Sequence, residues 1–335
     1  MRNYFPLLFG NETAKQLLGA DISEKKQHHA YMIEGPVGSG KHLLAKEFSK
    51  ALLCADPHSP TLPCGNCIHC RKIDAGRHTD IQYISCAKGT ISVETVRSTL
   101  GTLPYAPDEG DYQIYIIEDA HRMTPQAQNA LLLSLEEPPA YAVFLLLTED
   151  AAALLETIHS RACSIKMEQF SPDVLFSYLK EKNRSVSDEK LQEAVLRSGG
   201  TIGAAQKILS GDSATATLSA AAEAFVTVLC TGTGTDALAH CAELRQTLPR
   251  EEYDLFFVYA MSAVRDRIAA KLSGRDMLFY KSAPAPGGHT LTVKRLTALY
   301  DALYAAREDI VQPGASNTTI TTVLYTLVEQ HFRKE

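Results

Sequence analysis

The stretch Tyr31–His42 constrains the fold more than any other part of the chain. It reads Tyr-Met-Ile-Glu-Gly-Pro-Val-Gly-Ser-Gly-Lys-His. The apolar run that ends at Ile33 predicts a buried strand, and the run that starts at Leu43 predicts a helix. A G-x-x-x-x-G-K segment between a strand and a helix is typical of a phosphate-binding loop, whose backbone N–H groups face an anion at the helix N-terminus. The sequence therefore predicts a phosphate-loop fold.

The residues expected to form a nucleotide site in this loop are Gly35, Gly38, Gly40 and Lys41. The glycines let the backbone curl around the phosphates, and Lys41 would reach the outer ones. A functional loop ends in Ser or Thr, whose hydroxyl helps to hold Mg²⁺, but this chain has His42 there. Phosphate-loop ancestry is the favoured interpretation. The alternative is a glycine-rich turn that binds no nucleotide.

Length and composition indicate an ordinary globular protein. The chain has 335 residues, 45% of them hydrophobic and 21% charged, which predicts two or three domains. A net charge of −6 argues against a broad nucleic-acid-binding face. No apolar run reaches membrane-spanning length, and Met1–Pro6 lacks the apolar core of a signal peptide. We expect a cytoplasmic protein with no membrane partner.

Strands alternate with helices through the first half of the chain. The expected strands are His29–Ile33, Asp80–Ser85, Gln113–Ile117, Ala142–Leu147 and Ser164–Met167. The expected helices include Ser92–Leu103, one opened by Thr124 and Pro125 and stopped by Pro138, and Ala151–Ile158. This alternation predicts an α/β fold with a five-stranded parallel sheet, whose sites lie at the carboxyl ends of the strands.

An acidic pair, Glu118 and Asp119, follows the third of these strands. A phosphate-loop ATPase places its Mg²⁺-binding carboxylate and the carboxylate that polarises the attacking water there. Their usual order is Asp then Glu, and this chain has the reverse. We include both residues in a degenerate nucleotide site. The alternative is a solvated helix start.

Cys54, Cys64, Cys67 and Cys70 fall within seventeen residues. A reducing compartment disfavours disulfides, and the spacing is too tight for two independent bridges. Four thiolates fit a tetrahedral structural zinc site without an open position, and His58 and His69 lie nearby in sequence without being needed as ligands. The alternative is a loop of reduced cysteines.

The order of these motifs resembles the AAA+ domain of bacterial DNA polymerase III clamp-loader subunits. The resemblance covers most of residues 8–168. It depends on the four-cysteine insert and on three sequence motifs. The first motif is His29-Ala30-Tyr31. The second is Asn129-Ala130-Leu131-Leu132, which runs into Leu135-Glu136-Glu137-Pro138-Pro139, and the third is Thr157-Ile158-His159-Ser160-Arg161.

The resemblance implies roles for two further positions. In that family the arginine of a Ser-Arg-Cys motif projects into the neighbouring subunit's ATP site; Ser160-Arg161 is present here, followed by Ala162. Arg161 would act in trans as an arginine finger, the alternative being a surface ion pair. The nucleotide-sensing arginine of ATP-hydrolysing members aligns with Gly203.

We expect three domains. These are a phosphate-loop domain over residues 1–168 with the zinc insert at 54–70, a small helical lid over 169–210, and an all-helical collar for oligomerisation over 211–335. Within them, Gly211–Ser213 is expected to be a linker, Ala216–Leu229 a helix and Pro284–Gly288 a loop. No long C-terminal extension is expected.

Two functions remain open. The resemblance implies either a ring subunit with a silent nucleotide site that supplies Arg161, or a motor subunit that hydrolyses ATP through Lys41, Glu118 and Asp119. The partners implied are gamma/tau motor and delta subunits in a hetero-pentamer, with the sliding clamp and primed DNA. The chain would belong to a polymerase holoenzyme without being a polymerase or an active ATPase. An unrelated phosphate-loop protein such as a nucleotide kinase explains neither the cysteines nor Ser160-Arg161.

Overall fold

The computed structural model describes residues 2–56, 58–85, 89–210, 213–273, 291–311 and 316–332. Contacts divide the chain into two compact units. The first unit holds residues 1–175 and 200–204, and the second holds residues 176–199 and 205–335. The expected division of residues 169–335 into a lid and a collar stays a prediction.

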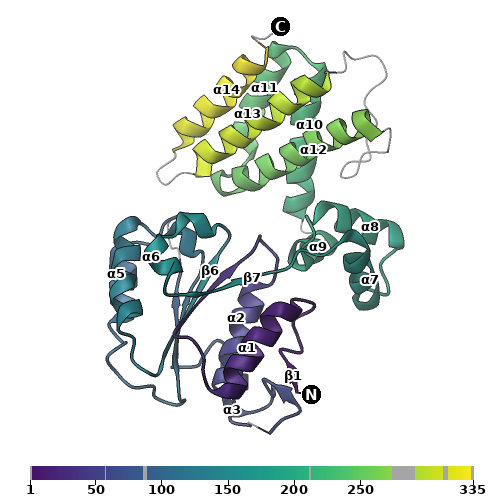
Figure 1. The fold of residues 1–335 in the computed structure, drawn as a ribbon. Helices are drawn as coiled ribbons and strands as arrows, with labels where there is room; N and C mark the ends of the chain where they lie inside the picture. Colours follow the sequence, from purple (N-terminus) through teal and green to yellow (C-terminus); the bar gives the residue numbers. More distant parts are fainter. Residues whose placement is uncertain are drawn as a thin grey trace. The chain divides into compact units, whose positions relative to one another are not determined.

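The first unit is built on a five-stranded sheet in the order β4-β5-β6-β2-β7 (Figure 1). All four pairings are parallel, which confirms the predicted sheet. The strands are β2 (Ala30–Glu34), β4 (Ile81–Ile84), β5 (Gln113–Ile117), β6 (Ala142–Thr148) and β7 (Cys163–Lys166). Every residue of β5 and β6 is buried, because helices cover both faces of the sheet.

Helices α1 (Glu12–Glu24) and α2 (Lys41–Leu52) pack on one face of the sheet, with α3 (Ile68–Asp74) beyond α2. Helices α4 (Val93–Leu100) and α5 (Pro125–Glu136) pack on the other. Ser92 and Thr124 are the N-caps of α4 and α5, because the hydroxyl of each accepts a backbone N–H group of the first turn.

The helix expected over Ala151–Ile158 is wrong in one respect, because two short pieces occur there. They are the 3₁₀ turn η2 (Ala151–Ala153) and the helix α6 (Glu156–His159). Leu154 and Leu155 between them are extended. The backbone N–H of Leu155 donates to Oε1 of Gln128 at 2.8 Å, so a contact with α5 replaces the helical hydrogen bond.

A second, two-stranded parallel sheet was not predicted. It pairs β1 (Asn3–Tyr4) with β3 (Thr61–Leu62) and so joins the start of the chain to the cysteine-rich insert. Two residues per strand are too few to give a periodic signal.

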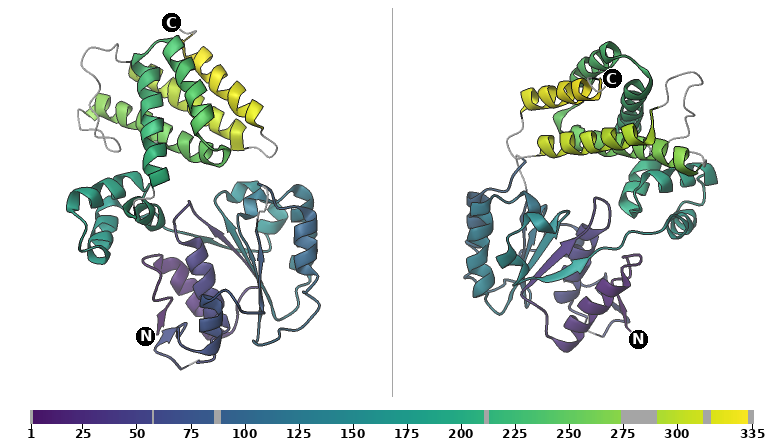
Figure 2. Two further views of the ribbon diagram at one scale, coloured as in Figure 1. Left: turned by 180° about the vertical axis from the view of Figure 1, so that it is seen from behind. Right: turned by 45° about the horizontal axis from the view of Figure 1, so that its top comes forward.

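The second unit is helical throughout its described residues (Figure 2). Its helices, two of which begin in the first unit, are α7 (Pro172–Lys182), α8 (Asp188–Arg197), α9 (Ile202–Leu209), α10 (Ser213–Thr231), α11 (Gly234–Thr247), α12 (Tyr253–Ser273), α13 (Val293–Val311) and α14 (Asn317–Phe332), with the short 3₁₀ turn η3 (Arg250–Glu252) before α12. Phe225, Phe256 and Phe257 are fully buried in its core.

In the second unit, Ser213 begins α10 rather than ending the expected linker, and α10 contains the predicted Ala216–Leu229 helix. Gly211 and Asp212 of that linker, and the loop expected over Pro284–Gly288, lie outside the described residues. Among the helices that are described, none is long and apolar enough to span a membrane.

Candidate functional site

The phosphate loop lies where the sequence predicts it, between the end of β2 and the start of α2. Gly38 and Gly40 have φ values of 78° and 97°, a region that side chains other than glycine rarely adopt. The N–H of Gly35 donates to the carbonyl of Thr148 at the end of β6 (3.1 Å). The loop therefore sits at the carboxyl edge of the parallel sheet, as expected.

Lys41 is turned back on its own loop. Its ammonium donates to the carbonyls of Gly35 and Pro36, and the residue is only 4% exposed. Burial lowers the pKa of Lys41, while the nearby carboxylates of Glu149 and Asp119 oppose the shift. The charge that would bind an outer phosphate is thus satisfied within the loop.

His42 faces the acidic pair. Its Nε2 lies 3.8 Å from Oε1 of Glu118, at the carboxyl end of β5. In this arrangement an imidazole, which is cationic when protonated, lies next to the carboxylate expected to hold a metal ion. Asp119 has a left-handed backbone (φ 50°), and its Oδ2 lies 3.9 Å from Nε of Arg122. The two predicted carboxylates are therefore both at this edge, and each has a basic side chain nearby.

Gly203 contacts the phosphate loop directly. Its N–H donates to the carbonyl of Gly38 at 2.9 Å. A Cβ placed on Gly203 would lie 2.8 Å from Cα of Gly38, and one placed on Gly38 would lie 2.6 Å from the backbone nitrogen of Ala204. Position 203 therefore has no room for a side chain in this arrangement.

Glu149 was missed by the sequence analysis. It follows β6 directly and acts electrostatically on Lys41, as does Asp119. The sequence could have indicated Glu149. The carboxyl ends of parallel strands share one edge of the sheet, so residues that follow β6 must lie beside those that follow β5. His121 is at the same edge, where its Nδ1 accepts the backbone N–H of Glu149 (3.4 Å).

The four predicted cysteine ligands come together. The sulfurs of Cys54, Cys64, Cys67 and Cys70 all lie within 4.8 Å of one another. Cys64 and Cys70 have their sulfurs 3.9 Å apart, close to the separation of about 3.8 Å that two thiolates have on a tetrahedral zinc ion. The cluster could therefore hold a metal ion with sulfur ligands.

Backbone N–H groups within the cluster already point at sulfur. Cys67 N–H donates to the sulfur of Cys64 (3.3 Å), and Cys70 N–H donates to that of Cys67 (3.4 Å). Burial acts to raise the pKa of Cys67, but hydrogen bonds from the backbones of Cys70 and Ala55 outweigh it and lower the pKa to about 7. Burial raises the pKa of Cys54 and of Cys70. Such backbone donors favour thiolates, which are the form that binds metal.

Arg161 lies just after α6 and is tied to α5. Its Nη2 donates to Oε1 of Glu136 at 2.9 Å, and its Nη1 donates to the carbonyl of Thr157 and the hydroxyl of Ser160. Both charged side chains are accessible, with exposed fractions of 33% for Arg161 and 47% for Glu136. The guanidinium thus lies at the surface of this unit in an ion pair.

The matches to known proteins fall mainly in the first unit. Residues 10–171 match the family model described as "DNA polymerase III, delta subunit". The DNA polymerase III tau subunit of Salmonella typhimurium is 38% identical over 164 residues, which cover 49% of this chain and 25% of that protein. The delta′ subunit of Pseudomonas aeruginosa is 34% identical over 201 residues, which cover 58% of this chain and 60% of that protein.

The chain therefore spans about a quarter of the tau relative and less than two thirds of the delta′ relative. A solved structure is similar as well. It is a DNA polymerase III gamma subunit-related protein from Thermotoga maritima, with a TM-score of 0.48 and 20% identity over 96% of this chain and 99% of that one.

A parallel sheet with a glycine-rich G-x-x-x-x-G-K loop at its carboxyl edge, between a strand and a helix, defines a phosphate-loop domain. The sequence matches point to the particular family. Residues 10–171, which make up most of the first unit, are similar to the clamp-loader subunits of DNA polymerase III, among which tau and delta′ are two relatives.

Proposed function

We propose that this chain is the delta′-type subunit of a DNA polymerase III clamp loader. Its own nucleotide site would be silent, and it would act as an end-piece of a ring that loads the sliding clamp on primed DNA. The observation that carries the proposal is the pairing of His42 with Glu118. An imidazole stands where a metal-binding hydroxyl is required, and it lies beside a carboxylate that the metal would need.

Two further features support a silent site. The ammonium of Lys41 is held by carbonyls of its own loop. Gly203, which aligns with the nucleotide-sensing arginine of hydrolysing relatives, offers no charge, and its contact with Gly38 leaves no space for one. His42 and Gly203 each remove a different element of ATP chemistry, namely the metal ligand and the sensor.

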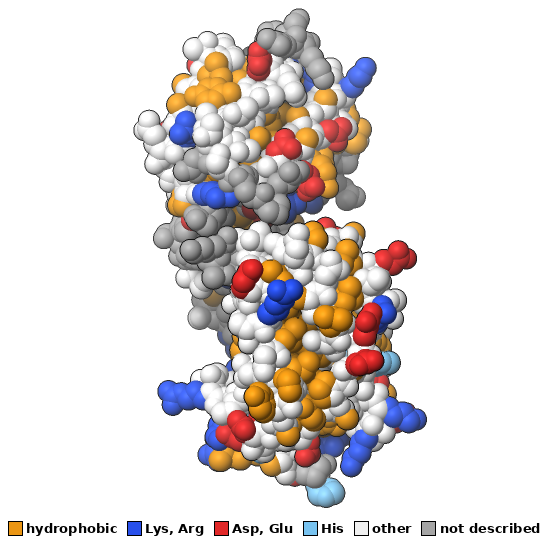
Figure 3. Space-filling model, turned by 90° about the vertical axis from the view of Figure 1, so that its left-hand side faces the viewer, with side chains coloured by type: hydrophobic (Ala, Val, Ile, Leu, Met, Phe, Trp, Pro, Cys, Tyr) orange, Lys and Arg blue, Asp and Glu red, His pale blue; other side chains and the backbone are white. Residues whose placement is uncertain are grey.

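Arg161 would be the residue that acts on a neighbour. A guanidinium placed against a γ-phosphate stabilises the charge that develops during transfer, an effect of about 10³–10⁵ in rate for an isolated site. Arg161 is accessible, and Leu133 lies one turn before its partner Glu136 on α5 with 74% of its surface exposed. Figure 3 views the side of the first unit that carries α5 and shows apolar side chains gathered there. An apolar surface beside an accessible arginine suits contact with another protein.

The four thiols would hold one structural zinc ion, which would cross-link the insert and leave no position open for catalysis. The three-domain division, the hetero-pentamer with gamma/tau and delta subunits, and a cytoplasmic location where replication takes place are parts of the same proposal. The helices of the second unit would provide the collar.

The competing function is an ATP-hydrolysing motor subunit of the gamma/tau type. It is favoured by the intact Gly35–Lys41 loop, by the acidic pair at the end of β5 and by the similarity to tau subunits.

ATP turnover separates the two functions. The purified chain should hydrolyse no ATP above background, and Lys41→Ala should leave unchanged the rate of a complex assembled with gamma/tau and delta subunits, clamp and primed DNA. Turnover by the chain alone, or loss of the assembled rate in Lys41→Ala with assembly intact, would establish the motor function instead.

A further inference from the structure

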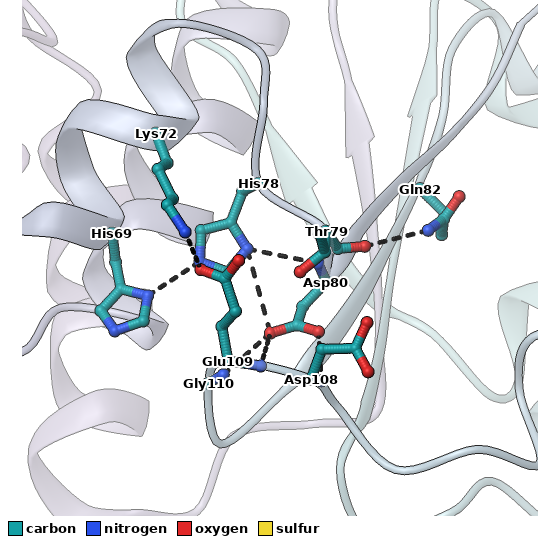
Figure 4. Close-up of polar contacts among 9 residues, drawn as sticks. All are labelled: His69, Lys72, His78, Thr79, Asp80, Gln82, Asp108, Glu109 and Gly110. Carbon is teal, nitrogen blue, oxygen red and sulfur yellow. Dashed lines mark hydrogen bonds and ion pairs between the residues drawn. The ribbon is translucent and has the colours of Figure 1, made fainter.

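A second group of metal-ligand side chains lies apart from the thiols. His69 on α3, His78 before β4 and Glu109 before β5 have ligand atoms that all lie within 4.8 Å of one another (Figure 4). The group is at the amino ends of the strands, opposite the edge that carries the phosphate loop. We propose that His69, His78 and Glu109 form a second metal site, which takes a divalent cation of the zinc type.

The two imidazoles already face each other across a shared proton. The backbone N–H of Asp80 donates to Nδ1 of His78 (3.3 Å), so the proton of that ring is on Nε2. Nε2 of His78 in turn lies 2.9 Å from Nδ1 of His69, which must accept. Two ring nitrogens thus converge on one point. On tetrahedral zinc they would be about 3.3 Å apart, a separation of a few tenths of an ångström more.

Metal binding needs a proton shift but no proton loss. The cation takes the Nε2 lone pair of His78, and the proton moves to Nδ1 of the same ring. Oδ2 of Asp80 lies 3.9 Å from that Nδ1 and can accept the proton after a small rotation of the ring, which also ends the contact between Nδ1 and the backbone N–H of Asp80. A carboxylate behind a metal-binding histidine is the arrangement that fixes the ring and its tautomer.

The supporting residues are buried and hydrogen-bonded. Asp80 is 2% exposed, and its carboxylate accepts the backbone N–H groups of Asp108, Glu109 and Gly110 at 2.6, 2.9 and 2.8 Å. His78 is 6% exposed. These contacts hold the segment that carries Glu109 against the segment that carries His78, before any metal binds.

The ammonium group of Lys72 would compete with a metal ion for the carboxylate of Glu109. This ammonium lies 2.6 Å from Oε2 of Glu109, one turn along α3 from His69. A cation is therefore already placed at the carboxylate, and an incoming metal must displace it or use the other oxygen. Two imidazoles and one carboxylate favour zinc over magnesium or calcium and leave a fourth position to solvent. Occupancy would pin the insert helix α3 to the entries of β4 and β5.

The test uses the full chain with its thiol cluster loaded by one equivalent of Zn²⁺. Further Zn²⁺ is titrated calorimetrically, and Co²⁺ is added in parallel as a visible probe. We expect one additional equivalent per chain and a cobalt spectrum without thiolate-to-metal charge transfer. His69→Ala and Glu109→Gln should each weaken this second equivalent by about tenfold or more. Glu109 is not buried, so its substitution should leave the fold intact.

Two more variants sharpen the result. His58→Ala, a change at an exposed histidine of the same insert, is the matched control and should leave binding unchanged. Lys72→Met should tighten binding severalfold, because it removes the competing ammonium; a mere hydrogen-bond network predicts no such gain. Absence of a second equivalent, thiolate charge transfer in the cobalt spectrum, or an affinity that His69→Ala and Glu109→Gln leave unchanged would overturn the proposal.

Discussion

Arg161 and Glu136 form an ion pair with 2.9 Å between Nη2 and Oε1, and it joins the end of α6 to the end of α5. The pair keeps the guanidinium extended along the surface instead of folded into the core. A residue that acts on a neighbouring subunit must be held in this way and still be free to leave. The contribution of this ion pair to stability therefore tests whether Arg161 can leave Glu136 to act on a neighbouring subunit.

Glu136→Gln should lower the free energy of unfolding of the isolated chain by less than about 1 kcal/mol, because exposed ion pairs contribute little. Urea denaturation measures this, with Glu137→Gln on the adjacent exposed glutamate as the matched control. A loss above about 2 kcal/mol relative to that control would make the pair a structural element and argue against a mobile Arg161.

His42→Ser should restore a hydroxyl to the phosphate loop and release Glu118 from its basic neighbour. We expect Mg²⁺-dependent ATP affinity to rise by up to about tenfold, which equals about 1.4 kcal/mol. Hydrolysis should stay at background, because Gly203 still supplies no arginine. Calorimetric titration with and without Mg²⁺ measures the gain, and His58→Ser is the control. An ATP affinity that does not respond to Mg²⁺ in the variant would show that His42 is not what silences the metal position.

Cys70→Ser should abolish zinc binding at the thiol cluster and destabilise the insert by several kcal/mol, since Cys70 is fully buried among the other sulfurs. Metal analysis and thermal denaturation report the two effects. Cys163→Ser changes a thiol outside the cluster and should retain the metal. If Cys70→Ser kept both its zinc and its stability, the cluster would not be a structural zinc site.

Stability should fall as the pH drops below about 6.5. Burial is the main cause that lowers the pKa of His29, His78 and His121 in the folded chain. Below the unfolded value of about 6.5 the unfolded chain therefore binds protons that the folded chain does not, which favours unfolding by up to about 1.4 kcal/mol per histidine per pH unit.

His121→Gln should remove its share of this dependence. Urea denaturation between pH 7.5 and 5.5 would show a shallower fall in the variant, by less than about 1 kcal/mol at the acid end, because solvent screens a half-buried imidazole. His58→Gln at an exposed position is the control, and any loss of zinc at low pH affects both proteins equally. Equal slopes in His121→Gln and the unaltered chain would show that His121 titrates alike in both states.

Local patterns were enough to predict much of this molecule. The phosphate loop, the five strands and the cysteine cluster each depend on residues close in sequence, and the structure has them where expected. The contact of Gly203 with Gly38 joins residues far apart in the chain, so no local pattern could show it.

The same holds for the group at His69, His78 and Glu109, which three separate segments bring together. The break at Leu154 and Leu155 was missed for a similar reason, because a side chain of α5 takes the hydrogen bond that would have continued a helix.

The proposed action of Arg161 on a neighbouring subunit's ATP is tested in the reconstituted complex. Clamp loading and DNA- and clamp-stimulated ATP hydrolysis are compared for complexes reconstituted with the unaltered chain, with Arg161→Ala and with Arg161→Lys. Only the adjoining ATP site loses its guanidinium, so the total rate should fall by less than the roughly 10³–10⁵ expected of an isolated site. Arg161→Lys should rescue poorly, because a point charge lacks the planar fork.

Assembly, monomer stability and zinc content should stay unchanged in Arg161→Ala, since the side chain is accessible and contributes little to the core. We expect an intact Arg161→Ala complex that loads clamps slowly. An intact Arg161→Ala complex that loads clamps at the normal rate would contradict this expectation and leave Arg161 as an ordinary surface residue paired with Glu136.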